Sequence, residues 1–201
     1  MTKPTRPKQF IDFRTPAAGF DQPLALWSAC HERVLRMVSL LGRLVEHIST
    51  TGVDESARVT AASIRRYFDE AVPRHHEDEE VDLFPRLLAS PAARDDGRIA
   101  SALATLEKDH EDLGAMWPAL RATLLALERG EAVRFDDVSV ALFISRYRTH
   151  CEVEDEAIGP ALARALDAKA LAEVGRAMAK RRGVDWDDLA TPAGELAQRT
   201  G

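Results

Sequence analysis

The chain has few cysteines and no long apolar segment, which limits the classes of protein to which it can belong. Only Cys30 and Cys151 occur among its 201 residues, so no disulfide framework is expected and a reducing cytoplasm is the expected location. No run approaches the roughly 18 apolar residues that a membrane-spanning helix needs, and residues 1–20 lack the apolar centre of a signal peptide. The net charge of −6 leaves no basic excess. These absences argue against membrane and nucleic-acid partners.

The composition suits one helical domain with short extensions. Hydrophobic residues make up 45% of the chain and charged residues 30%, which allows a sizeable core and is unlike a disordered segment. Four long stretches repeat apolar residues at steps of three and four, the period of helices in a bundle. We therefore predict an all-α fold, an up-down-up-down four-helix bundle with an additional short C-terminal helix. The expected parts are an N-terminal arm over residues 1–20, the bundle over 21–167, and the C-terminal helix and tail over 168–201.

Capping residues, glycines and prolines indicate where the helices end. Aspartates suit the N-caps of three helices, and glycines suit the ends of two. The expected caps are Asp21, Asp54 and Asp136 or Asp137, and the glycines are Gly52 and Gly130. Pro73 and Pro85 are expected to bend or break the second helix, and residues 90–97 have the composition of a turn.

One motif occurs twice in the chain. His75 and Glu79 are four residues apart, and Pro85 follows the glutamate by six residues. The second copy, with the same spacing, consists of His150, Glu154 and Pro160. Residues four apart share one face of a helix, so each copy directs an imidazole and a carboxylate toward one point.

Single histidines on the first and third helices extend this repeat. His31 and His110 lie on the inward apolar faces, where an unpaired polar group is costly. Each half of the chain thus pairs a helix with one inward histidine and a helix with a His-x-x-x-Glu motif. A bundle with pseudo-twofold symmetry would bring these residues to one level of its core, where each half could supply one metal ion with ligands. The six predicted ligands are His31, His75, Glu79, His110, His150 and Glu154.

This set of donors suits a pair of transition-metal ions. Four neutral imidazoles and two carboxylates favour a divalent or trivalent transition ion. If Glu79 and Glu154 both bridge, each ion receives two histidine nitrogens and two carboxylate oxygens, which leaves about two positions on an octahedral iron. One position could hold a shared oxo or hydroxo group, and the other is open to oxygen, peroxide or another small ligand. Four histidines could instead hold one zinc ion tetrahedrally.

These residues resemble the pattern of the hemerythrin-like, or HHE cation-binding, family. The resemblance covers residues 22–166 and includes all six predicted ligands. The Glu-Glu-x-x-Leu-Phe-Pro run from Glu79 to Pro85 is similar to the signature of the family's second helix. The resemblance implies a four-helix bundle with a non-haem di-iron centre.

The chain departs from the oxygen-carrying hemerythrins of invertebrates, which use five histidines, one glutamate and one aspartate. Four residues after His110 comes Gly114, so no fifth inward histidine accompanies the third helix. The final carboxylate, Glu154, lies four residues after His150 instead of an aspartate five after it, although Asp155 occupies that place. The pattern therefore resembles the bacterial duplicated variant, which favours redox turnover or iron sensing over reversible oxygen carriage.

The predicted function is that of a non-haem di-iron protein which binds, senses or reduces oxygen or peroxide. In an enzymatic interpretation, with peroxide- or nitric-oxide-decomposing activity, Tyr147 is a nearby proton donor. A sensory or iron-handling interpretation requires a redox or signalling partner that the sequence does not identify. A zinc-stabilised structural bundle stays open as a third interpretation. No glycine-rich loop for another cofactor occurs, so electrons would have to come from outside the chain.

Several neighbours of the predicted ligands have simpler interpretations. His76 and Glu80 share the four-residue spacing, but they lie off the apolar face, and Cys151 stands where the second copy would need a histidine. Cys30 and Cys151 are expected to be small packing residues, and the basic run 180–182 to complement a helix dipole. Most acidic neighbours are expected to face solvent, with one or two accepting a hydrogen bond from a ligand histidine. These acidic residues are Glu32, Glu77, Asp78, Glu111, Glu152, Asp155 and Glu156.

Overall fold

Four long helical rods make up most of the chain. The computed structural model describes residues 19–186, and no strand occurs in that range. The first and third rods are single helices, and the second and fourth each combine α-helical and π-helical (η) segments. The bounds are α1 Pro23–Thr51, α2 Glu55–Arg66, η1 Tyr67–Ala71, α3 Val72–Glu77, η2 Asp78–Leu83, α4 Phe84–Ala89, α5 Pro91–Asp95, α6 Gly97–Glu128, α7 Asp137–Val153, η3 Glu154–Ile158, α8 Gly159–Ala165 and α9 Ala168–Arg181.

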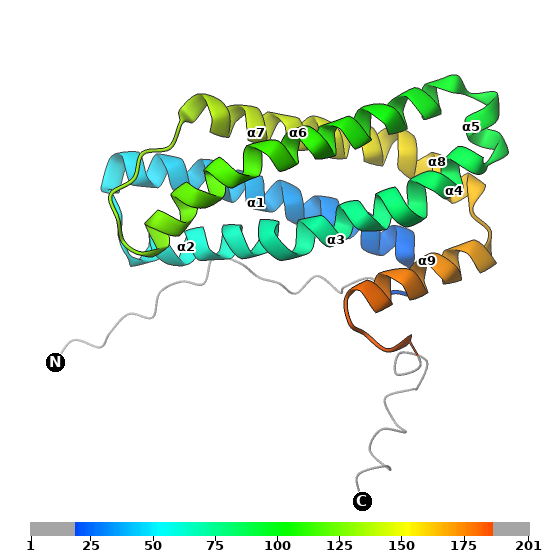
Figure 1. Ribbon diagram of the computed structural model, residues 1–201, viewed down its shortest axis with the longest axis horizontal. Coiled ribbons are helices and arrows are strands. Elements are labelled where there is room, and N and C mark those ends of the chain that lie inside the picture. The colour runs from blue at the N-terminus through cyan, green and yellow to red at the C-terminus, as the bar shows by residue number, and fades with distance from the viewer. Residues whose placement is uncertain (1–18, 187–201) are drawn as a thin grey trace, which may run out of the picture.

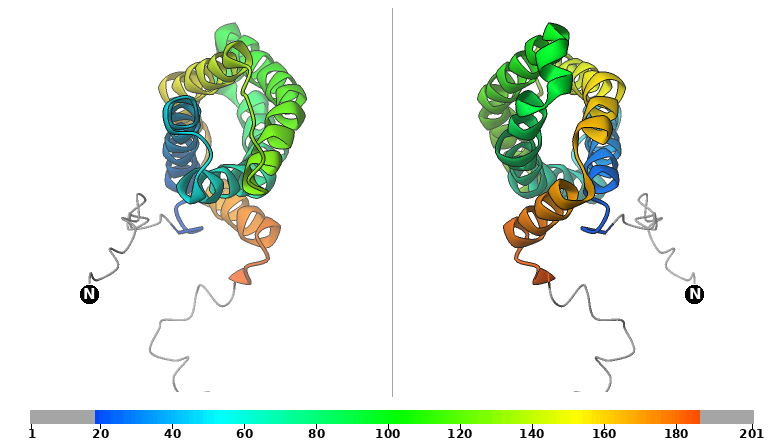
Figure 2. Two further views of the ribbon diagram at one scale, coloured as in Figure 1. Left: turned by 90° about the vertical axis from the view of Figure 1, so that its left-hand side faces the viewer. Right: turned by 90° about the vertical axis from the view of Figure 1, so that its right-hand side faces the viewer.

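The rods pack in the order of the chain and close into a ring. α1 contacts α2, α2 contacts α6, α6 contacts α7, and α7 contacts α1. The two views along the bundle show this ring (Figure 2). α9 lies outside the ring, against α1 and η2 (Figures 1 and 2). The predicted all-α bundle with an added C-terminal helix is confirmed. None of the helices within residues 19–186 is long and apolar enough to cross a membrane.

Each π-helical segment ends two residues before a proline. The backbone N–H groups of Val72, Phe84 and Gly159 donate to carbonyls five residues earlier, those of Tyr67, Glu79 and Glu154. The next residue in each case is a proline, which has no N–H group and cannot continue the α-helical ladder. The prolines are Pro73, Pro85 and Pro160. The rods therefore continue through the prolines with a wider helical turn and do not break. In two of these turns the accepting carbonyl belongs to a glutamate of the repeated motif.

Most of the expected helix ends are confirmed. Asp54 accepts a hydrogen bond from the backbone N–H of Ala57, and Asp136 accepts one from Val138. Gly52 and Gly130 follow α1 and α6 with φ of 89° and 79°, values that favour glycine.

Two expected boundaries were wrong. The N-cap of α1 is Gln22, not Asp21, and its side chain makes no capping hydrogen bond. Pro23 then occupies the first turn, where its missing N–H is tolerated. The segment expected to be a turn contains the short helix α5, which the Ser90 side chain caps by accepting from the N–H of Ala93.

The core consists of two apolar clusters with polar residues between them. The α2-side cluster is built around residues such as Val38, Ile64, Leu124 and Phe143. The α9-side cluster is built around residues such as Trp27, Leu83, Leu106, Ile158 and Met178. Every rod contributes to both clusters, and on each rod the histidines and glutamates of the predicted site lie where one contribution gives way to the other. Phe20, at the end of the expected N-terminal arm, packs against the α9-side cluster.

Candidate metal centre

The polar layer between the two clusters contains all six predicted ligands. α1 provides His31, α3 provides His75, η2 provides Glu79, α6 provides His110, α7 provides His150 and η3 provides Glu154. None of the six is more than 6% exposed, and both glutamates are fully buried. Buried imidazoles and carboxylates need a partner of opposite charge or a ligand. The structure thus brings the predicted set together in the place where a cation would satisfy it.

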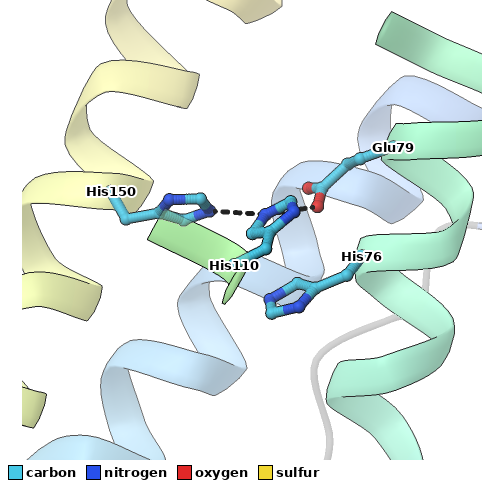
Figure 3. Close-up of side chains that lie close together, drawn as sticks. All are labelled: His76, Glu79, His110 and His150. Atoms are coloured by element: carbon cyan, nitrogen blue, oxygen red, sulfur yellow. Dashed lines mark hydrogen bonds and ion pairs between the residues drawn. The ribbon is translucent and has the colours of Figure 1, made fainter. Parts of the chain in front are cut away.

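Within this layer the donor atoms form two groups that share one glutamate. In each group the donor atoms all lie within 4.8 Å of one another, close enough to hold one ion. The first group consists of His31, His75, Glu79 and Glu154. The second group consists of His76, Glu79, His110 and His150 (Figure 3).

The two oxygens of Glu79 point in different directions. Oε1 lies 3.1 Å from Nε2 of His75 in the first group, and Oε2 lies 3.3 Å from Nε2 of His110 in the second. Glu154 also lies between the groups, because its Oε2 is 3.3 Å from Nε2 of His31 and 3.2 Å from Nε2 of His150. Glu79 therefore presents one oxygen to each group, whereas Glu154 approaches both groups with the same oxygen.

Acidic residues outside the layer orient two of the histidines. Nδ1–H of His31 donates to Asp155 at 2.7 Å, and Nδ1–H of His110 donates to Glu80 at 2.6 Å. In both rings this places the other nitrogen, Nε2, toward the group. One of the acidic neighbours expected to accept from a ligand histidine, Asp155, does so. Glu80, which was considered only as a partner of His76, does the same.

His76, which was not among the predicted ligands, lies in the second group. Its ring stacks on that of His110, with centroids 3.8 Å apart and an angle of 11° between the planes (Figure 3). Adjacent residues of a regular α-helix point about 100° apart, so His75 and His76 were not both expected to face inward. The π-helical segments on either side of α3 each hold an extra residue per turn, which changes the facing of the residues around them. The histidine doublet between two prolines was the available signal in the sequence.

Burial disfavours the charged forms of the two glutamates. Burial and the neighbouring Glu154 raise the pKa of Glu79 to about 7. Burial also raises the pKa of Glu154 to about 7, although the nearby His31 favours its charged form. For His31 burial favours the neutral ring, but the hydrogen bond to Asp155 and the adjacent glutamates outweigh burial and raise its pKa to about 10.

The other histidines of the layer are neutral at physiological pH. Burial, together with the charge of neighbouring histidines, lowers the pKa of His75 and of His76 well below the usual range. Burial also lowers the pKa of His110 and of His150, although nearby Glu79 opposes it in both cases. Neutral imidazoles have a free nitrogen lone pair, the form in which histidine binds metal.

Several inward-facing atoms find no hydrogen-bond partner among the described residues. They are Nε2 of His31, Oε2 of Glu79 and both carboxylate oxygens of Glu154, all fully buried. A buried polar atom without a partner costs of order 1–3 kcal/mol. A cation bound between these atoms would satisfy them together, so the donor set fits a pair of metal ions.

Comparison with known proteins agrees with this geometry. Residues 22–162 match the sequence model of the family described as the hemerythrin HHE cation-binding domain. The chain belongs to the hemerythrin HHE family. A relative from Haemophilus influenzae, described as an uncharacterized protein, is 31% identical over 168 residues, which is 83% of this chain and 94% of the relative. The matched range contains every residue of both groups and excludes α9.

A tyrosine and two cysteines lie on the same helices as the predicted ligands, close to them in the sequence. Tyr147 is 3% exposed and packs against Phe68 and Phe143. Burial raises the pKa of its phenol, so the phenol keeps its proton at physiological pH. Cys151 is buried as expected, whereas Cys30 is only partly so, and both thiols are free.

One acidic residue expected on the solvated face is instead buried beside the layer. Asp78, next to Glu79, is 2% exposed and accepts hydrogen bonds from Arg181 and Arg182 at the end of α9. Arg181 also donates to Asp82 at 2.8 Å. The basic run was expected to complement the dipole of its own helix, but its arginines form this α9 clasp, which joins the C-terminal helix to η2.

Proposed function

We propose that the protein binds two iron ions in a non-haem centre and that this centre binds or reduces oxygen or peroxide. The observation that supports it best is the shared Glu79, which presents one oxygen to each of two histidine-rich groups. Imidazole and carboxylate ligands together suit iron among the common transition metals. Bound iron would supply the electrons for the reduction of a small oxygen species.

The protein's own residues have defined tasks in this proposal. His31, His75 and Glu154 would hold one ion, His76, His110 and His150 the other, and Glu79 both. Asp155 and Glu80 keep the proton of their histidines on Nδ1, so that Nε2 faces the metal. The two apolar clusters exclude bulk water on both sides of the layer. Tyr147, three residues before His150, keeps its phenol proton in the α2-side cluster because burial raises its pKa.

The test is the metal content and the visible spectrum of protein purified from iron-supplied cells. The proposal requires about two irons per chain and oxo-bridged charge-transfer bands that respond to oxygen or peroxide. Zinc, a single ion or no metal would contradict the di-iron proposal. Because a metal that binds only the folded state stabilises it, removal with a chelator should also lower the melting temperature. At a free metal concentration 100-fold above Kd the stabilisation is about 2.7 kcal/mol.

A sensory function is a second candidate, and the α9 clasp favours it. Asp78 is the residue before Glu79, and its carboxylate holds two arginines at the end of the chain's last described helix. A change in the position of Glu79 on metal binding would therefore reach α9 through one peptide unit. Limited proteolysis of the iron-loaded and iron-free protein distinguishes the candidates. Cleavage near α9 that depends on iron supports sensing, and equal cleavage contradicts it.

A further inference from the structure

Trp27 donates a hydrogen bond to the shared carboxylate. Its indole Nε1–H lies 2.6 Å from Oε1 of Glu79, and both side chains are almost fully buried, Trp27 at 2% and Glu79 at 0% exposure. The indole ring also packs edge-on against His31, with centroids 4.4 Å apart. The donor therefore approaches Glu79 from the side of the first group.

We infer that Trp27 is a positioning residue, which holds Glu79 in its bridging orientation and makes the two glutamates unequal as ligands. The inference rests on the proposed two-metal function. Oε1 receives the indole N–H and faces the first group, while Oε2 receives no hydrogen bond and faces His110. Rotation of the carboxylate about its axis would break the bond to the indole. The bond thus favours one oxygen for each ion over both oxygens on one ion.

Glu154 has no corresponding donor. Neither of its oxygens accepts a hydrogen bond from the described residues. The repeat explains the difference, because Trp27 lies four residues before His31 and the matching position before His110 is Leu106. Leu106 is buried but cannot donate. A donor to one carboxylate oxygen withdraws electron density from it, so Glu79 is the weaker ligand on the side of the first group.

The Trp27 ring packs closely against the backbone of the fourth rod at Gly159. A Cβ added to Gly159 would lie 3.3 Å from the Trp27 ring, so only glycine fits comfortably at that position. Trp27 also belongs to the α9-side cluster, and its ring spans from that cluster to the polar layer. The packing therefore holds the indole N–H toward Glu79, as hydrogen-bond partners of metal ligands are commonly held.

The test is Trp27→Phe with Trp117→Phe as the matched control. Trp117 also donates its indole N–H to a carboxylate, that of Asp69 at 3.0 Å, but away from the polar layer. Trp27→Phe is expected to weaken metal binding by about 10–100-fold, the usual effect of removing a partner of a ligand. It should also change the Mössbauer signal of one of two iron ions more than the other. Trp117→Phe should leave both measurements as in wild type.

Replacement of Trp27 by benzothienylalanine, in a Trp117→Phe/Trp186→Phe background, separates the donor from the volume of the ring. Sulfur then stands where the N–H was, so weakened metal binding in this variant identifies the lost donor as the cause. If both Trp27 variants keep the metal affinity and the spectrum of the wild type, the inference about Trp27 is overturned, even if their melting temperature is lower. The proposed function would not be affected by that result. The metal content of the wild type is measured on its own, and a wild type without metal would overturn the proposed function and this inference together.

Discussion

The two copies of the His-x-x-x-Glu motif share their spacing but not their surroundings. In the first copy Glu79 accepts from Trp27, His76 joins the second group, and Asp78 is held by the α9 clasp. In the second copy the glutamate has no donor, and the positions that match His76 and Asp78 are Cys151 and Val153. The repeated motif accounts for a site with two halves, and the surroundings of the first copy make that half the more constrained. The predictions below test this difference, beginning with the largest expected effect.

The glutamates give the sharpest contrast. Glu79→Gln should remove both metal ions, because it weakens an oxygen in each group. Glu154→Gln should mainly weaken the first group and leave about one ion bound. Metal analysis of both purified variants, with circular dichroism to confirm the helical fold, measures the difference. Equal metal loss in the two variants would contradict this difference and would show that the two glutamates contribute equally to the two groups.

The residues that follow the two histidines form the next comparison. His76→Ala should lower the affinity of the second group by at least the ~10–100-fold that is typical for a supporting partner, because a direct donor is lost. Cys151→Ala should leave metal binding intact and lower the free energy of unfolding by about 1 kcal/mol, as an average buried substitution does. Titration with Co²⁺ and urea unfolding measure the two effects. Normal metal binding by His76→Ala would show that His76 packs against its neighbours and does not bind metal.

Acid should weaken the centre. In the metal-free protein the pKa values of Glu79 and Glu154 are raised to about 7 and that of His31 to about 10, above their ordinary values of 4.5 and 6.5. Protons therefore compete with metal more strongly as the pH falls, by about tenfold per pH unit for each proton displaced. Co²⁺ titrations at pH 6, 7 and 8 should show rising affinity, with a shallower slope in Glu154→Gln. An affinity independent of pH would contradict the assigned ligands.

The α9 clasp is expected to affect the stability of the fold more than metal binding. Asp78→Ala leaves two arginines without one acceptor, and the loss of hydrogen bonds to a charged group should lower the unfolding free energy by about 2–3 kcal/mol. Arg181 keeps Asp82 as a partner, which limits the loss. Val153→Ala, at the matching position of the second copy, should cost about 1 kcal/mol. Urea unfolding of both metal-free variants measures this, and equal costs would mean that the clasp adds no stability.

Most of the architecture could be predicted because helical periodicity and duplication are properties of local sequence. The inward steps of three and four identified His31, His110 and both motifs as parts of one layer, and aspartates at Asp54 and Asp136 marked helix starts. The placement of the layer followed because an amphipathic helix has only one apolar face to bury.

The remainder depends on interactions that periodicity does not contain. A π-helical turn changes the hydrogen-bond register by one residue while the apolar pattern stays almost the same, so the inward facing of His76 was missed. The α9 clasp joins Asp78 to residues more than 100 positions later, and no local pattern encodes such a pair. The bond from Trp27 to Glu79 likewise spans 52 positions.

The polar layer leaves the bundle with two separate hydrophobic clusters, and this bears on how the protein matures. Each cluster draws side chains from all four rods, so each can bring the rods together by itself. The histidines and glutamates come into register only as a result. We therefore expect a newly made chain to fold before it is loaded, so that metal supply controls activation of the protein rather than its abundance.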